Sequence, residues 1–166
     1  TVYLHKVADL EFLPGAIDGL RDMQLNLDAK FIVVTNQAGI AKKLYTEQDF
    51  RVFNNEMVSC LRNAGVLIAQ TYYCPHRPDI TGICGCRKPN PGMVYQAVRD
   101  FGLNPKQAIF IGDKDCDIEL GQQFDAKTIL VANSQYEVKA TPSSRVTNLI
   151  EAAEIVRSWR SEPFNI

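Results

Sequence analysis

Short apolar runs rich in β-branched and aromatic residues alternate along this chain with segments of helical periodicity. The runs cover residues 30–35, 66–73, 108–113 and 127–132. Continuous apolar runs of this length are typical of strands buried on both faces, and their alternation with helices indicates parallel strands. We therefore predict an α/β fold over residues 1–166, a Rossmann-like single domain whose parallel sheet carries helices on both faces.

The helical segments carry recognisable start and stop signals. Residues 14–29 open with a proline, a good first-turn residue, and residues 91–102 begin with a proline and end with a glycine. Residues 46–65 open with Thr46 as N-cap and Asp49 three residues later. We expect two further helices, one from about Asp117 and one over residues 145–160.

The composition excludes several classes of protein. The 166 residues are 46% hydrophobic, carry a formal charge of −1, and spread their 18 Lys and Arg along the chain. A nucleic-acid-binding protein usually shows a basic stripe, and a membrane helix needs about 18 consecutive apolar residues. Five cysteines, an odd number, fit reduced cytosolic thiols better than a disulfide framework. We expect a cytoplasmic monomer that binds neither nucleic acid nor membrane.

A cluster of soft metal ligands occupies residues 74–86. The ligands are Cys74, His76, Cys84 and Cys86, in the pattern C-x-H-x7-C-x-C. Three thiolates and one imidazole complete a tetrahedral zinc site and leave no position for a catalytic water, so we predict a structural zinc. The alternatives are free buried thiols or a Cys84–Cys86 disulfide. A DNA-reading zinc finger would need a downstream recognition helix and positive charge.

Polar side chains follow two of the predicted strands. Thr35, Asn36 and Gln37 stand where a strand meets a glycine-containing turn, and their hydroxyl and amides can bind an anion, although turn chemistry alone would explain them. Asp113 and Asp117 come at the end of a later strand. Carboxylates there suit Mg²⁺, although either residue could simply cap the next helix.

Two adjacent cations follow directly after the last cysteine of the cluster. Arg87 offers a fork-shaped donor and Lys88 a point charge, a pair that suits phosphate. Adjacent basic residues more often belong to a solvated surface. Their position after the metal-ligand cluster favours the functional interpretation.

The segments "EFLPGA", "VVTNQAGIA", "YYCPH", "CGCRKPNPGM" and "IGDKDCD" together resemble the zinc-containing phosphatases of the haloacid-dehalogenase (HAD) superfamily, over residues 1–132. The resemblance implies a HAD-like fold and Mg²⁺-dependent hydrolysis of a phosphomonoester through a phospho-aspartate. Within this group the motifs are most similar to those of the heptose bisphosphate phosphatases, which implies removal of the C7 phosphate of D-glycero-D-manno-heptose 1,7-bisphosphate in nucleotide-heptose and lipopolysaccharide biosynthesis. Histidinol-phosphate phosphatase and a non-catalytic zinc-stabilised pseudo-phosphatase are the alternatives.

The same resemblance implies a role for each motif residue. Thr35 would stabilise the transferring phosphoryl group, Lys88 would neutralise its charge, and Asp113 would hold Mg²⁺, with Asp117 as a second candidate ligand. The other side chains expected at the substrate are Tyr3, Asn36, Gln37, Arg87 and Lys114. Because Arg87 directly follows the zinc ligand Cys86, we expect the zinc to fix the direction of both cations.

One part of the family pattern, Asp-x-Asp-Gly-Thr after an apolar strand, does not occur in this sequence. Asp9 and Glu11 have the right spacing, but no buried strand precedes them and no Gly-Thr follows. We expect the aspartyl nucleophile to lie upstream of Thr1, in roughly twenty further residues that form one strand and a loop. The given chain would then lack the first strand of its domain.

Overall fold

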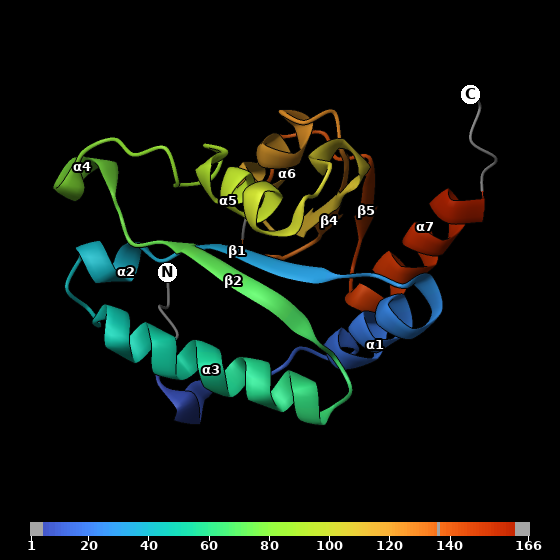
Figure 1. Ribbon diagram of the computed structural model, residues 1–166, viewed down its shortest axis with the longest axis horizontal. Coiled ribbons are helices and arrows are strands. Elements are labelled where there is room, and N and C mark those ends of the chain that lie inside the picture. Colours follow the sequence, from blue (N-terminus) through green and yellow to red (C-terminus); the bar gives the residue numbers. More distant parts are fainter. Residues whose placement is uncertain (1–4, 136, 162–166) are drawn as a thin grey trace. The chain divides into compact units, whose positions relative to one another are not determined.

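The structure, a computed structural model, describes residues 5–135 and 137–161 and is drawn in Figure 1. Its contacts divide the chain into two units, one of Thr1–Glu11 with Phe31–Lys106 and one of Phe12–Lys30 with Gln107–Ile166. Tyr3 lies outside the described residues. The single domain expected over residues 1–166 stays a prediction.

The first unit is built on two parallel strands. β1 (Phe31–Asn36) pairs with β2 (Ile68–Cys74), and the pairing runs without a break from Ile32 opposite Gln70 to the carboxyl ends of both strands. The register places Asn36 opposite Cys74. The end of β1 and the start of the metal-ligand loop therefore lie side by side.

Two long helices lie on opposite sides of this strand pair, as Figure 1 shows: α3 (Glu47–Asn63) and α5 (Gly92–Phe101). Successive side chains of a strand point to opposite faces. Tyr73 accordingly packs on Phe50 of α3, with ring centroids 4.7 Å apart. Tyr72 and Cys74 join Met93 and Ala97 of α5 in a buried core. The predicted helices on both faces are confirmed for this strand pair.

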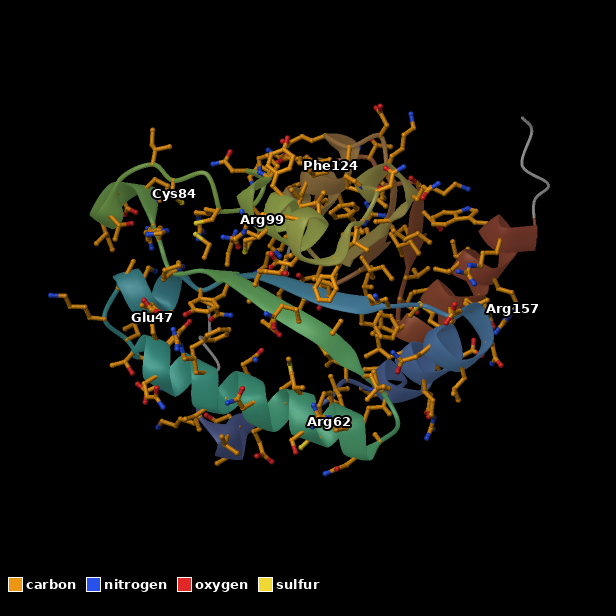
Figure 2. The ribbon with its side chains drawn as sticks, in the orientation of Figure 1. Glu47, Arg62, Cys84, Arg99, Phe124 and Arg157 are labelled. Atoms are coloured by element: carbon orange, nitrogen blue, oxygen red, sulfur yellow. The ribbon has the colours of Figure 1, made fainter. Side chains whose placement is uncertain are left out.

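The second unit contains a three-stranded parallel sheet in the order β3-β4-β5. Its strands are β3 (Ile109–Gly112), β4 (Lys127–Val131) and β5 (Ser144–Val146). α6 (Asp115–Gln122) packs on β3 and β4, and α1 (Ala16–Leu27) packs along α7 (Leu149–Ser161). Phe124, labelled in Figure 2, stacks on Phe110 of β3 at a centroid distance of 6.0 Å.

Local end signals are confirmed where the sequence is most explicit. The Thr46 hydroxyl accepts a hydrogen bond from the Asp49 N–H, and the Asp49 carboxylate accepts one from the Thr46 N–H, which completes a capping box at the start of α3. α5 ends at Gly102 in the left-handed conformation (φ 63°). No helix in the described part of the chain has both the length and the apolar character needed to cross a bilayer.

The sequence prediction was wrong in three places. Residues 144–146 form β5, so the last helix begins at Leu149 rather than at residue 145. A three-residue strand is too short to show a period of two, so periodicity could not reveal it. α6 begins at Asp115, two residues before the predicted start. A four-residue helix, α4 (Pro78–Thr81), lies inside the metal-ligand loop and was not among the predicted helices. The remaining short elements are η1 (Val7–Asp9), α2 (Ala38–Ala41) and η2 (Pro105–Gln107).

Candidate functional site

The predicted zinc ligands converge in the first unit. One ligand atom from each of Cys74, His76, Cys84 and Cys86 lies within 4.8 Å of all the others. The Sγ–Sγ distances are 3.0 Å for Cys74–Cys86 and 3.6 Å for Cys74–Cys84 and Cys84–Cys86. His76 Nδ1 lies 3.3 Å from Cys86 Sγ and 3.6 Å from Cys74 Sγ. With zinc–sulfur bonds of about 2.3 Å, the edges of a tetrahedral site are about 3.8 Å, so this donor set fits a zinc ion.

The thiols are free, and the protein shifts the pKa values of Cys74 and Cys84 in opposite directions. All five cysteines are unpaired, which removes the Cys84–Cys86 disulfide as an alternative. Burial, followed by the neighbouring thiols, raises the pKa of Cys74 to about 12 when no metal is present. Burial also acts to raise the pKa of Cys84, but the backbone N–H of Arg87 and the thiols beside it outweigh burial and lower that pKa. Zinc would hold all three sulfurs as thiolates.

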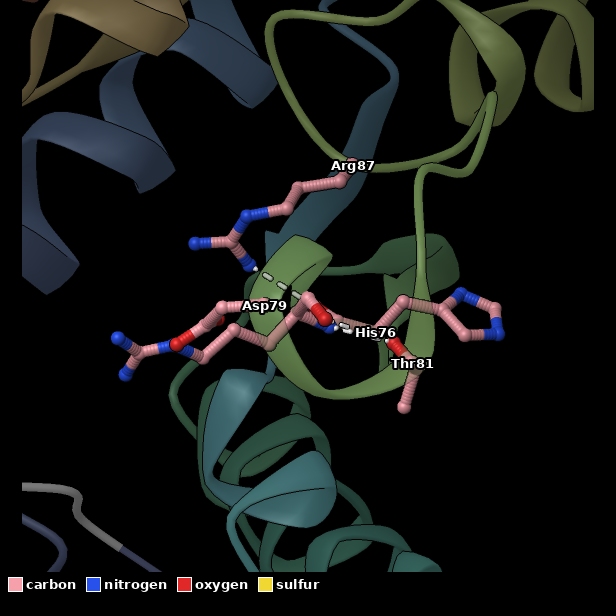
Figure 3. A network of polar contacts seen from close by, with 5 residues as sticks. His76, Asp79, Thr81 and Arg87 are labelled. Atoms are coloured by element: carbon pink, nitrogen blue, oxygen red, sulfur yellow. Dashed lines mark hydrogen bonds and ion pairs between the residues drawn. The ribbon is translucent and has the colours of Figure 1, made fainter.

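The loop of ligands is tied to the cation that follows it. The Arg87 guanidinium donates from Nη1 to the carbonyl of His76 at 3.2 Å, as Figure 3 shows. α4 is closed by a hydrogen bond from the Thr81 hydroxyl to the Arg77 carbonyl at 2.9 Å. The Arg87 side chain therefore has a defined direction that depends on the path of the metal-ligand loop.

Lys88 makes three hydrogen bonds to residues near the end of β1. Its backbone N–H donates to Asn36 Oδ1 at 2.9 Å, and its carbonyl accepts from Asn36 Nδ2 at 3.1 Å. Its ammonium donates to the carbonyl of Val34 at 2.6 Å. Both polar atoms of the Asn36 side chain are thus bonded to the main chain of Lys88. We call this pair of hydrogen bonds the Asn36 clamp.

The hydroxyl of Thr35 belongs to a second set of hydrogen bonds. It accepts from Gln37 Nε2 at 2.9 Å, and Gln37 Oε1 accepts from the hydroxyl of Tyr45 at 2.6 Å. The Gln37 backbone N–H also donates to the carbonyl of Cys74 at 2.8 Å. Thr35 and Cys74 are therefore connected through one residue, Gln37.

A cavity of about 200 Å³ opens beside the two cations of the first unit. Arg87 and Lys88 both line it, so a ligand in this cavity would meet two positive charges. The other lining residues are Pro78, Ile83, Cys84, Pro89 and Asn90.

The predicted magnesium residues belong to the second unit. Asp113 follows β3, and its Oδ2 accepts from Asn133 Nδ2 at 3.3 Å. Asp117 Oδ2 accepts from the backbone N–H groups of Asp113 at 3.2 Å and Lys114 at 3.1 Å. The side chain of Asp117 therefore caps the start of α6, the structural alternative that the sequence left open.

The structure brings some predicted residues together and adds others that the sequence did not reveal. At the end of β1, hydrogen bonds join Asn36 to Lys88 and, separately, Gln37 to Thr35. Lys114 is exposed at the start of α6. Tyr45 and Asn133 were not predicted. Neither lies in a motif, and only the position of Tyr45 soon after the "TNQAGIA" turn could have suggested it.

Comparison with protein families matches residues 85–156 to the HAD-hydrolase-like family. A protein of Photorhabdus laumondii, D-glycero-alpha-D-manno-heptose-1,7-bisphosphate 7-phosphatase, is 37% identical over 126 residues, which are 73% of this chain and 68% of the relative. The D-glycero-beta-D-manno-heptose-1,7-bisphosphate 7-phosphatase of Haemophilus influenzae is 35% identical over 123 residues, 72% of this chain and 66% of the relative. The chain thus spans about two thirds of the length of these two relatives.

The fold has relatives among solved structures. The crystal structure of a D,D-heptose 1,7-bisphosphate phosphatase from B. bronchiseptica, complexed with magnesium and phosphate, superposes with a TM-score of 0.81 at 23% identity. The superposition covers 95% of this chain and 89% of that one. At this identity the likeness establishes the HAD-like fold.

Proposed function

The chain belongs to the HAD-like hydrolases, in the family that includes the D-glycero-D-manno-heptose-1,7-bisphosphate 7-phosphatases, and we propose that it removes the 7-phosphate of that sugar. The observation that carries the proposal is the 37% identity over 126 residues with the Photorhabdus laumondii relative. The phospho-aspartate step predicted from the resemblance requires an aspartyl nucleophile, which the motifs quoted above do not include. The assays below use the natural protein.

Thr35 and Lys88 are the residues proposed to act on the transferring phosphoryl group. Negative charge on its oxygens is stabilised by donors and cations that are already in place before the reaction. The Thr35 hydroxyl would donate to one oxygen from the end of β1. An ammonium carries three N–H donors, so the bond from Lys88 Nζ to the Val34 carbonyl fixes the position of Nζ without neutralising its charge.

Arg87 and Lys114 are proposed to recognise the rest of the substrate. A guanidinium matches a phosphate oxygen pair, and the bond to the His76 carbonyl supports a fixed position for Arg87. The side-chain amides of Asn36 and Gln37 are already hydrogen-bonded to other groups of the protein. For these two residues we propose that they orient Lys88 and Thr35 rather than contact the sugar.

Asp113 is the proposed magnesium ligand. It follows a strand directly, and Mg²⁺ favours one or two carboxylates together with waters and substrate phosphate. Asp113 is preferred to Asp117, whose Oδ2 already accepts two backbone N–H groups. The B. bronchiseptica relative is described as a complex with magnesium and phosphate. When bound, the ion would neutralise charge on the phosphoryl group.

Zinc is proposed to bind Cys74, His76, Cys84 and Cys86 in a structural role. Four protein ligands fill a tetrahedral site, so no open position remains for substrate or water. Its contribution would be mechanical, because the loop carries Arg87 and Lys88 directly after its last ligand.

The test is turnover of defined phosphate esters with Mg²⁺. We expect both anomers of heptose 1,7-bisphosphate to lose the 7-phosphate, measured by inorganic phosphate release and by NMR of the product. Histidinol phosphate should react at least about 100-fold more slowly in kcat/KM, because a substrate that leaves polar site groups unpaired is strongly disfavoured. A preference for histidinol phosphate would favour that enzyme. Ester binding without any turnover would identify a pseudo-phosphatase.

A matched pair of lysine variants tests the role of Lys88. Lys88→Met should lower kcat by about 10²- to 10³-fold, since it removes a preorganised charge at the phosphoryl group. Lys106→Met removes a lysine of η2 that has no proposed role, and its kcat should be unchanged. Equal activities of the two variants would remove Lys88 from the site.

A further inference from the structure

We infer that Tyr45 is a positioning residue for phosphoryl transfer. It acts on Thr35 through the side-chain amide of Gln37. The inference rests on the proposed function, because Thr35 is the residue proposed to donate to the phosphoryl group. Tyr45 lies outside every motif of the sequence and was not among the predicted site residues.

The hydrogen bonds from Tyr45 to Thr35 run in one direction. The Tyr45 hydroxyl donates to Gln37 Oε1 at 2.6 Å, and Gln37 Nε2 donates to Thr35 Oγ1 at 2.9 Å. These distances match their types, because O–H···O bonds are typically 2.5–3.0 Å and N–H···O bonds 2.7–3.2 Å. The opposite orientation of the amide would place a nitrogen 2.6 Å from the phenol oxygen, which is short for a neutral N–H···O bond.

The direction matters for the proton of Thr35. A hydroxyl has one donor and two acceptor lone pairs, and Thr35 uses a lone pair to accept from Gln37. Its own proton therefore points away from Gln37. Within residues 5–135 and 137–161, the Gln37 amide is the side-chain partner found for this hydroxyl. The proton is thereby directed to an acceptor supplied from outside, which in the proposed reaction is a phosphoryl oxygen.

Tyr45 is itself held in one place. The residue is 7% exposed, and its ring stacks on that of His5, with centroids 5.0 Å apart and planes 10° apart. Gly39 makes room for it, since a Cβ on Gly39 would lie 2.1 Å from Tyr45 Cε1. The backbone N–H of Leu44 donates to the carbonyl of Gly39 at 3.0 Å, which closes the turn between them. A rigid donor of this kind can fix which end of an amide faces it.

Loss of the Tyr45 hydroxyl has a specific consequence. Gln37 would keep Thr35 as a partner but lose the partner that distinguishes Oε1 from Nε2. The amide could then flip, so that Oε1 faces Thr35. The Thr35 hydroxyl would then donate its proton to Oε1 instead of to the substrate. Turnover should fall while substrate affinity changes little.

The first variant is Tyr45→Phe, which removes one oxygen and keeps the stacked ring. We expect kcat on heptose 1,7-bisphosphate to fall by about three- to tenfold, with KM within about twofold of the wild-type value. The matched control is Tyr72→Phe. Its hydroxyl donates to Asp100 Oδ2 at 2.7 Å, also on a buried tyrosine of the first unit, but it does not reach Thr35. We expect Tyr72→Phe to lower the melting temperature and to leave kcat unchanged.

A double-mutant cycle with Thr35→Val identifies the path. If Tyr45 acts through Thr35, Tyr45→Phe should change the remaining activity of Thr35→Val by less than about twofold. Gly39→Ala, which pushes the ring from its place, should reproduce the kcat loss of Tyr45→Phe. An unchanged kcat in Tyr45→Phe would overturn the inference, as would an equal loss in the wild-type and Thr35→Val backgrounds.

A readout without turnover separates this inference from the proposed function. In ¹⁵N-labelled protein, the side-chain amide signals of Gln37 should shift in both Tyr45→Phe and Thr35→Val and stay in place in Tyr72→Phe. Unchanged Gln37 signals in Tyr45→Phe would refute the relay whatever the enzyme hydrolyses. Shifted signals in a protein that hydrolyses no phosphate ester would refute the proposed function and leave the hydrogen-bond relay standing.

Discussion

Replacing Asn36 by alanine should release Lys88 from the end of β1 and lower both stability and turnover. The Asn36 clamp joins two segments that are 52 residues apart in the sequence. Its two bonds hold the backbone N–H and the carbonyl of Lys88, so they determine where the side chain of Lys88 starts. Alanine keeps the strand conformation possible and removes both bonds at once.

The magnitude follows from the number and environment of these bonds. Each is a neutral hydrogen bond in a half-buried position and should contribute about 0.5–1.5 kcal/mol to the free energy of unfolding, so the pair contributes about 1–3 kcal/mol. For a chain of this size the melting temperature should fall by about 2–12 °C. A displacement of Lys88 by about 1 Å would lower kcat by up to about 100-fold.

The assay compares Asn36→Ala with Asn90→Ala in the natural protein. Asn90 Nδ2 donates to the carbonyl of Cys84 at 2.7 Å, so the control also removes a hydrogen bond from a side-chain amide to the main chain of the metal-ligand loop. Urea denaturation gives the free energy of unfolding of each variant, and the rate of phosphate release gives its kcat. Asn36→Ala should lose about twice the stability that Asn90→Ala loses, and it should lose far more of its kcat. The kcat effect should shrink in a Lys88→Met background, because the clamp acts through that side chain.

Two results would refute this reasoning. If Asn36→Ala is as stable and as active as Asn90→Ala, the clamp does not hold Lys88. If Asn36→Ala lowers kcat by the same factor with and without Lys88, Asn36 acts on the substrate directly, as the family resemblance first suggested.

Three further predictions concern the zinc loop and the core beneath it. Removal of zinc by a chelator should lower kcat and loosen residues 74–90 in hydrogen exchange while Mg²⁺ still binds; full activity of verified zinc-free protein would contradict the structural role. Gly92→Ala should destabilise the protein by about 1–3 kcal/mol and speed zinc release to a chromophoric chelator, because its Cβ would lie 2.4 Å from the Gly85 carbonyl oxygen. Gly85→Ala, whose Cβ meets nothing within 4 Å, should stay within about 0.5 kcal/mol of the wild type. Burial and then the Asp100 hydrogen bond raise the pKa of Tyr72 to about 12. The folded state therefore favours the neutral phenol, so this contribution to stability is complete below about pH 10 and is lost as the pH rises from 10 towards 12. Melting temperatures between pH 8 and 11.5 should fall less steeply in Tyr72→Phe than in the wild type, and equal slopes would contradict the shift.

Features encoded by neighbouring residues could be predicted from the sequence alone. The capping box of Thr46 and Asp49, the glycine stop of α5 and the four strands of continuous apolar residues depend on side chains a few positions apart. The clustering of Cys74, His76, Cys84 and Cys86 was predictable for the same reason, since these four side chains lie within thirteen residues of one loop. The short strand β5 could not be predicted in this way, because three residues are too few to show a period.

The two hydrogen-bond systems at the end of β1 were decided by the tertiary structure. The sequence places Asn36 and Lys88 in separate motifs, and only the parallel pairing of β1 with β2 brings the zinc loop back to β1 so that an amide can meet the Lys88 main chain. Tyr45 reaches Gln37 only because the chain turns back at Gly39, where a side chain would leave no room for its ring. Residue types determine which donors and acceptors a chain possesses. The path of the backbone determines which of them come within 3 Å of each other, and hydrogen bonds form only at that distance.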